Sequence, residues 1–319
     1  KEIPSGKLPE LDVAPGDVQR VTIPLKKFKP EAGVEYHVEL SFALKNDLPW
    51  AKAGHEIAWD EFQLPDNKPA DAFKPGRISG LKINKTENAV TISGKGFELV
   101  IDGQEGLKSW TANGTELVRS PLHPHFWRAL TDNDRGRGRP SDSQNVWRRA
   151  HNGVETQSFK VEKMKDHIAV VSELRLPRVN DATWTTTYKV FASGDVLVAA
   201  SFKPGQSNLI RMPRLGMQMT LPVGLDRISW FGPGPQETYI DRKDAKVGVY
   251  SGSVEEQFCA DYSEPGETGN KVEVRWVSLT NAKGAGLLAI GQPHLSVNAL
   301  HYGTEDLNAG KHPHALPRR

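Results

Sequence analysis

The 319-residue sequence holds a single cysteine, Cys259. One cysteine cannot form a disulfide within the chain, and it excludes a cysteine-rich metal site. No run of about 18 apolar residues occurs, so no segment predicts a membrane-spanning helix. A charge excess is also lacking, since 41 Lys and Arg face 39 Asp and Glu and leave a net charge of +2. We therefore expect neither a membrane nor nucleic acid as a partner.

Few segments show the hydrophobic periodicity of a helix. In most segments the apolar residues instead recur at every second position. Apolar residues alternate with other residues over Val34–Leu44, as they do along a β-strand. Trp184–Val190 and Val196–Phe202 flank the turn residues Ser193–Asp195 and predict a β-hairpin. Further predicted strands are Val90–Ile92, Phe97–Ile101, Ile168–Leu176 and Val272–Leu279. The best helix candidate is short, at Ser143–Ala150.

The composition agrees with a folded all-β chain. Hydrophobic residues make up 37%, with 8 Trp and 11 Phe, which is enough for a packed core. The 29 Gly and 22 Pro predict many turns. Many short strands joined by such turns indicate β-sandwiches.

A cluster of Pro, Asp and Asn within Leu64–Gly76 predicts a boundary. We expect one domain at 1–66, a linker at 67–76 and a large β-sandwich at 77–319. The first part has room for about four strands, whereas an immunoglobulin-like sandwich needs about seven. The expectation is that the chain begins inside such a sandwich.

Catalytic and metal motifs are sparse. The pairs His123 and His125, and His312 and His314, offer too few ligands for zinc. Asp132–Gly136 lacks the Gly and Glu that an EF-hand requires downstream. No nucleophile elbow occurs, and no two carboxylates can be paired by spacing. No metal ligand and no catalytic residue is assigned.

Two glycine-containing segments allow simple interpretations. Gly232–Glu237 carries two prolines, which remove backbone donors that a phosphate would need, so we interpret it as a rigid turn. Gly136–Arg139 is basic and rich in glycine, which suits a mobile surface loop or a site for an acidic ligand. Both interpretations of this second segment stay open.

Five ordered blocks resemble one family, the large bacterial β-galactosidases of glycoside hydrolase family 2. Ser120–Gly136 is similar to its Asp-Asn-Asp block, and Trp230–Arg242 to its Gly-Pro-x-Glu-x-Tyr-x-Asp-Arg block. The remaining three blocks are Leu11–Pro15, Ala53–Trp59 and Glu267–Trp276. Together they extend over nearly the whole chain.

The resemblance implies the later part of an immunoglobulin-like sandwich, followed by most of a large antiparallel β-sandwich similar to galactose mutarotase. It also implies that the catalytic glutamates and the Mg²⁺ ligands lie in a separate barrel. No cofactor is expected in this segment. The parent enzyme would be a homo-oligomer acting on a β-galactoside, in a bacterial cytoplasm or periplasm that the sequence does not identify.

The resemblance also suggests site residues. In the family, the stretch after Asp-Asn-Asp borders the active site and changes conformation with sugar. Here that loop comprises Asp132, Asn133, Asp134, Arg135, Gly136, Arg137 and Gly138. An alternative is that Asp132 and Asp134 only anchor the loop. The second block supplies residues expected to be structural: Gly232, Gly234, Glu237, Tyr239, Asp241 and Arg242.

The resulting hypothesis is a non-catalytic segment of a retaining β-galactosidase that shapes the active site and supports assembly. The alternatives are a free-standing carbohydrate-binding or mutarotase-like module, and a purely structural or oligomerising segment.

Overall fold

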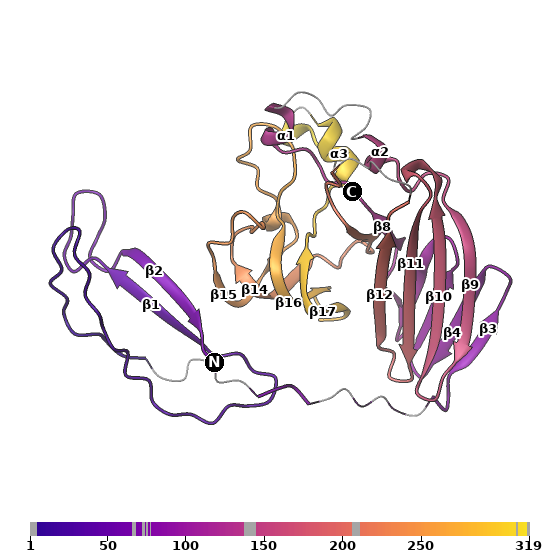
Figure 1. Cartoon of the computed structure of the whole chain (residues 1–319), viewed down its shortest axis with the longest axis horizontal. Helices are drawn as coiled ribbons and strands as arrows, with labels where there is room; N and C mark the ends of the chain where they lie inside the picture. Colours follow the sequence, from indigo (N-terminus) through magenta and orange to yellow (C-terminus); the bar gives the residue numbers. More distant parts are fainter. Residues whose placement is uncertain are drawn as a thin grey trace. The chain divides into compact units, whose positions relative to one another are not determined.

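The computed structural model describes residues 5–65, 68–71, 74, 76, 78–136, 145–205, 211–310 and 312–317. The chain forms two compact units, residues 1–73 and 74–319 (Figure 1). Nearly all of the regular structure consists of antiparallel strands, which confirms the all-β prediction. Within the described part of the chain, no helix has the length and apolar character needed to cross a membrane.

The first unit contains one two-stranded antiparallel sheet. Strand β1 (His37–Ala43) pairs with β2 (Glu56–Gln63), and a bulge interrupts the register at Phe42 and Ala43. The expectation of about four strands is therefore wrong for the described residues, which hold two. Prolines explain part of the difference: they interrupt residues 5–36 repeatedly and cannot donate ladder hydrogen bonds. These prolines are Pro9, Pro15, Pro24 and Pro30.

The second unit is built on two facing sheets. One has the order β13-β8-β6-β5-β4-β3, with β7 beside β6, and the other has the order β12-β11-β10-β9. The first sheet comprises β3 (Lys82–Lys85), β4 (Ala89–Gly94), β5 (Phe97–Asp102), β6 (Gly106–Ala112), β7 (Thr115–Glu116), β8 (Ser120–His125) and β13 (Gly216–Thr220). The second comprises β9 (Glu155–Lys163), β10 (His167–Leu176), β11 (Ala182–Phe191) and β12 (Val196–Lys203).

The two sheets pack against each other through the buried side chains that occur at every second position of their strands. In β10 and β11 every second side chain is buried, as the period-two pattern requires. The shared core draws Val90, Ile92, Leu99 and others from the first sheet, and Ile168, Val170, Tyr188 and Val190 from the second. The arrangement is a β-sandwich, and the hairpin of β11 and β12 lies where the sequence predicted it.

A third sheet of order β15-β14-β16-β17 has its own core around Ile228, Trp230, Val274 and Val277. Its strands are β14 (Arg227–Gly234), β15 (Lys246–Ser253), β16 (Lys271–Thr280) and β17 (Gly286–Val297). The rigid turn expected at Gly232–Glu237 is wrong for its first half, because Gly232–Gly234 continue strand β14 and pair with β15. Pro233 has no N–H to donate, and its carbonyl accepts a hydrogen bond from Trp230 Nε1 over 3.0 Å.

Short helices occur between the strands and after the last one. They are α1 (Asp132–Gly136), α2 (Asn145–Arg148) and α3 (Thr304–Ala309), with single 3₁₀ turns at Pro177–Val179, Glu255–Gln257 and Pro313–Ala315. Of the helix predicted at Ser143–Ala150, residues 143 and 144 lie outside the described residues, 145–148 form α2, and 149–150 form a turn. A small apolar cluster of Ala129, Leu307 and Leu316 lies between the segment leading to α1 and the segment around α3.

Candidate functional site

The segment before α1 is held by a forked ion pair. Arg128 Nη1 donates to Asp134 Oδ2 over 2.6 Å, and Nη2 donates to Oδ1 over 3.2 Å. The backbone N–H and the hydroxyl of Thr131 also donate to Asp134 Oδ2, over 2.9 and 3.0 Å. Partial burial would raise the pKa of Asp134, but the bonds from Arg128 and Thr131 hold that pKa below its ordinary value.

The same segment is tied to α3. The backbone N–H of Leu130 donates to Asn308 Oδ1 over 3.2 Å. The other amide atom, Asn308 Nδ2, is buried and has no hydrogen-bond partner. A buried donor without a partner is costly, so Asn308 offers an unused hydrogen-bonding group next to this segment.

The other residues of the predicted loop differ in position. Asp132 and Asn133 are exposed on α1, and the backbone of Arg135 and Gly136 completes that helix. Arg137 and Gly138 lie outside the described residues. The structure thus brings Asp134 into a network with Arg128 and Thr131, and leaves Asn133 directed to solvent.

Glu237 is the centre of a second polar network. Its carboxylate accepts bonds from Arg242 and from the Tyr262 hydroxyl. Thr268 Oγ1 and the backbone N–H of Gly269 donate to its other oxygen over 3.2 and 2.7 Å. Burial would raise the pKa of Glu237, but these donors lower it. The network therefore joins the Trp230–Arg242 block to the Glu267–Asn270 block.

Neighbouring groups of the second block are hydrogen-bonded to the Glu267–Asn270 segment as well. The backbone N–H of Thr238 donates to Asn270 O over 2.7 Å, and Asn270 Nδ2 donates back to Thr238 O over 3.0 Å. The Tyr239 hydroxyl is buried without a hydrogen-bond partner, and burial raises its pKa. Asp241 is exposed.

Packing explains the two glycines of this block. A Cβ on Gly234 would lie 2.6 Å from the Tyr250 ring, and one on Gly232 would lie 3.1 Å from Val274 Cα. The approach at Gly234 is closer than a Cβ allows unless the Tyr250 ring moves, and the approach at Gly232 is tight, so contacts and not a turn explain glycine at these positions.

A buried lysine completes the second network. Lys271 is 2% exposed, with Nζ 4.7 Å from the centre of the Trp230 ring and 3.1 Å from Gly269 O. Burial lowers the pKa of Lys271 to about 8. The sequence offered no signal for this lysine, because its aromatic neighbour Trp230 lies about 40 residues earlier in the chain.

An ion pair connects the Glu267–Asn270 block to residues near β8. Arg214 Nη2 donates to the buried carboxylate of Glu267. His125, at the end of β8, has a pKa lowered to about 4 by burial and then by the charge of Arg214. His125 is therefore neutral at neutral pH.

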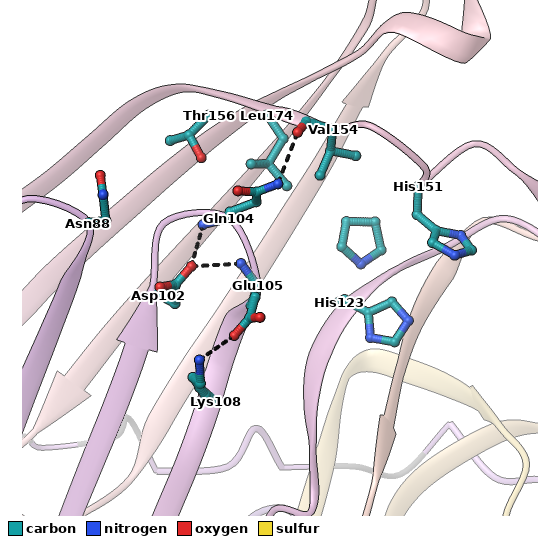
Figure 2. A pocket seen from close by; sticks show the side chains of 11 residues that line it. Asn88, Asp102, Gln104, Glu105, Lys108, His123, His151, Val154, Thr156 and Leu174 are labelled. Atoms are coloured by element: carbon teal, nitrogen blue, oxygen red, sulfur yellow. Dashed lines mark hydrogen bonds and ion pairs between the residues drawn. The ribbon is translucent and has the colours of Figure 1, made fainter.

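A polar groove of about 600 Å³ opens beside β8 (Figure 2). The imidazoles of His123 and His151 lie at one end, with ring centres 6.1 Å apart. Burial and the neighbouring His123 lower the pKa of His151. The other end is the turn after β5, where Asp102 accepts the N–H groups of Gln104 and Glu105 over 2.8 and 2.9 Å.

The groove contains groups suited to a small neutral polar ligand. Gln104 Nε2 donates to Val154 O over 3.1 Å, and Glu105 pairs with Lys108 over 2.6 Å. The sequence did not single out this groove, because its walls are distant in sequence. Across the ranges that the structure describes, no three His, Cys, Asp or Glu side chains gather closely enough to hold a metal ion.

Comparisons with known proteins agree on one family. Residues 93–319 match the family described as Beta galactosidase small chain, and residues 1–65 match Beta-galactosidase, domain 4. A beta-galactosidase of Priestia megaterium is 34% identical over 96% of this chain and 30% of its own length. A beta-galactosidase of Lactobacillus delbrueckii subsp. bulgaricus is 30% identical over 95% of this chain and 29% of its own length. A beta-galactosidase of Clostridium acetobutylicum is 31% identical over 75% of this chain and 26% of its own length. The chain spans less than a third of each of these curated relatives.

Proposed function

Because this chain belongs to the beta-galactosidase small chain family, we propose that it is a non-catalytic segment of a retaining β-galactosidase of glycoside hydrolase family 2. The parent enzyme hydrolyses terminal β-D-galactosides through a covalent glycosyl-enzyme, with its two catalytic glutamates outside this segment. What carries the proposal is the match over residues 93–319, which contains both polar networks.

The role proposed for the segment is to position part of the active-site wall. The fork between Arg128 and Asp134 fixes the start of α1, so Asp132–Gly136 occupy a defined place in the fold. The exposed side chain of Asn133 supplies an amide donor and acceptor at that place. Such groups suit sugar hydroxyls, which both donate and accept hydrogen bonds.

The Mg²⁺ expected for the family is proposed to bind in the parent barrel. The described residues of this chain do not fit it, because they lack a cluster of carboxylates and imidazoles. No step of the proposed role passes through the metal.

Hydrolysis of nitrophenyl β-D-galactoside tests the proposal. The purified chain should be inactive, and an enzyme that carries this segment should be active and release β-galactose first, as seen by proton NMR. Turnover by the isolated chain, or initial release of the α-anomer, would contradict it. In the active enzyme, Asn133→Ala should raise KM for the galactoside, whereas Asp241→Asn, at an exposed position of the other block, should not.

A second candidate is sugar binding by this chain alone, as a carbohydrate-binding or mutarotase-like module. The observation that favours it is the polar groove with His123 and His151. Calorimetric titration with galactose and lactose should then show binding that His151→Ala weakens. Absence of heat at millimolar sugar would reject this candidate without affecting the first.

A further inference from the structure

Strand β12 (Val196–Lys203) forms the end of its sheet, and the structure places no described strand beside its outer edge (Figure 1). An edge strand presents unpaired N–H and C=O groups that can template another strand. Natural edges are commonly blocked by charge or proline. Residues 196–202 contain neither, and Lys203 is the strand's one charged residue.

The ladder with β11 determines which groups face the open edge. The N–H of Phe191 donates to Asp195 O over 3.0 Å, so the backbone C=O of Asp195 points toward β11. The direction of the backbone N–H and C=O groups alternates from residue to residue along a strand, so those of Leu197, Ala199 and Ser201 also point toward β11. The N–H and C=O groups that point outward then belong to Val196, Val198, Ala200 and Phe202.

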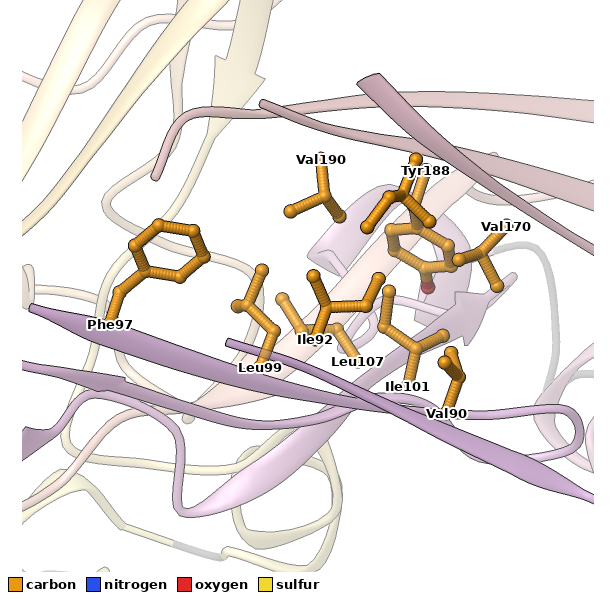
Figure 3. Packing of buried hydrophobic residues seen from close by; sticks show 10 residues of the cluster. Val90, Ile92, Phe97, Leu99, Ile101, Leu107, Val170, Tyr188 and Val190 are labelled. Atoms are coloured by element: carbon orange, nitrogen blue, oxygen red, sulfur yellow. The ribbon is translucent and has the colours of Figure 1, made fainter. Parts of the chain in front are cut away.

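The side chains of these outward residues lie on the core face. Val198 pairs with Tyr188 and Val196 with Val190, and both partners are completely buried (Figure 3). Val198 is nevertheless 38% exposed, and Ala200 is exposed too. The core of the sandwich is therefore open along this edge, and an added strand would cover it.

We propose that the outer edge of β12 pairs antiparallel with β12 of a second copy of this chain. Ala199 then faces Ala199 of the second copy across a two-fold axis, Val198 faces Ala200, and Val196 faces Phe202. Every pair on the core face is apolar. The pairing depends on this edge alone and does not require galactoside hydrolysis.

Charge favours this register over its neighbours. It places Lys203 opposite Asp195 of the second copy, and both side chains are exposed at the ends of the strand. Opposite charges across a strand pair are stabilising. The adjacent registers that keep the same faces place Lys203 opposite Leu197 or Ser193 and lose the ion pair.

The first test is the solution mass of the 319-residue chain by light scattering and sedimentation. We expect a concentration-dependent species of twice 35.3 kDa. Ala200→Pro removes an outward N–H and leaves the β11 ladder intact, so it should weaken the dimer about 30-fold without altering the circular dichroism spectrum. Ile290→Ser, at an exposed apolar position on β17, serves as the matched control and should leave the dimer unchanged.

Cysteine cross-linking tests the register in a Cys259→Ser background. Ala199→Cys would place two thiols in a non-hydrogen-bonded pair with Cα atoms about 4.5 Å apart, within disulfide reach. Ser201→Cys lies on the same face, but its two copies would be about 13 Å apart. Oxidised dimer at position 199 and not at 201 supports the proposal.

Four outcomes of these experiments would contradict the pairing of β12 with β12. A monomer at all concentrations, equal cross-linking at both positions, no cross-linking at either, or a dimer that Ile290→Ser breaks and Ala200→Pro does not would each overturn it. The double variant Asp195→Lys with Lys203→Asp should restore the dimer that Lys203→Asp weakens. Failure of that rescue would reject the register.

Discussion

Two guanidinium nitrogens of Arg128 donate hydrogen bonds to the carboxylate of Asp134, which lies six residues later in the chain. This fork fixes the backbone between the two residues, since the backbone N–H of Thr131 also donates to the carboxylate of Asp134. It connects the sandwich to the start of α1 and therefore to the loop proposed to border the sugar.

Breaking the fork should loosen that segment more than it destabilises the fold. Asp134→Ala should cost no more than about 1 kcal/mol of unfolding free energy, because a third of the carboxylate is exposed. The amide of Thr131 should exchange with deuterium faster, as hydrogen-exchange mass spectrometry can measure. Unchanged exchange at Thr131 would show that Asp134 does not hold the segment. Asp132→Ala, at an exposed neighbour, serves as the control.

Removing the carboxylate of Glu237 should destabilise the second network strongly. Glu237→Ala leaves the N–H of Gly269 and the guanidinium of Arg242 without their acceptor, so we expect a loss of about 2–4 kcal/mol in urea unfolding. Asp241→Asn is exposed and should change stability by less than about 0.5 kcal/mol. Equal effects of the two substitutions would contradict the network.

The pH dependence of Glu237 follows from the direction of its shift. Its folded pKa lies below the ordinary 4.5, so the carboxylate stabilises the fold above the unfolded pKa. That contribution is lost as pH falls from 4.5 through the lower folded value. Unfolding free energy measured below pH 4.5 should fall more steeply in the parent chain than in Glu237→Gln.

Lys271 should also make stability rise with pH, but in an alkaline range. Its folded pKa is about 8, below the ordinary 10.5, so the unfolded chain binds more protons between these values. Unfolding free energy should therefore rise by roughly 3 kcal/mol from pH 8 to 10.5 from this group. Lys271→Met should remove that rise, whereas Lys95→Met, at an exposed site, should preserve it. A rise that persists in Lys271→Met would assign it to another group.

The requirement for glycine at position 234 can be tested by a single methyl group. Gly234→Ala places Cβ 2.6 Å from the Tyr250 ring and should cost about 2 kcal/mol through overpacking. Gly216→Ala, in β13, meets nothing closer than the Arg214 side chain at 3.9 Å and should be nearly neutral. Thermal melting compares the two. Equal melting temperatures would show that the Tyr250 ring moves aside freely.

Local patterns predicted much of the fold and little of the site. Strands such as Ile168–Leu176 were recognisable because one face is buried and burial alternates at period two. The prediction of a turn at Gly232–Gly234 was wrong. The glycines and prolines there suggested a turn, but the segment pairs with β15 and packs against Tyr250 and Val274. Helix α3 carried no signal, since six residues are too few for a helical period to be seen.

Strand periodicity and ordered motifs are local properties, and they were enough to identify the all-β class, the main hairpin and the family. Which side chains contact one another depends on how distant segments come together in the fold. Glu237 accepts a hydrogen bond from Gly269, 32 positions later in the chain, and His123 lies close to His151, which no motif paired with it. Antiparallel sheets bring such distant segments into register through long-range pairing, and the charge, burial and hydrogen bonding of each site follow from that pairing.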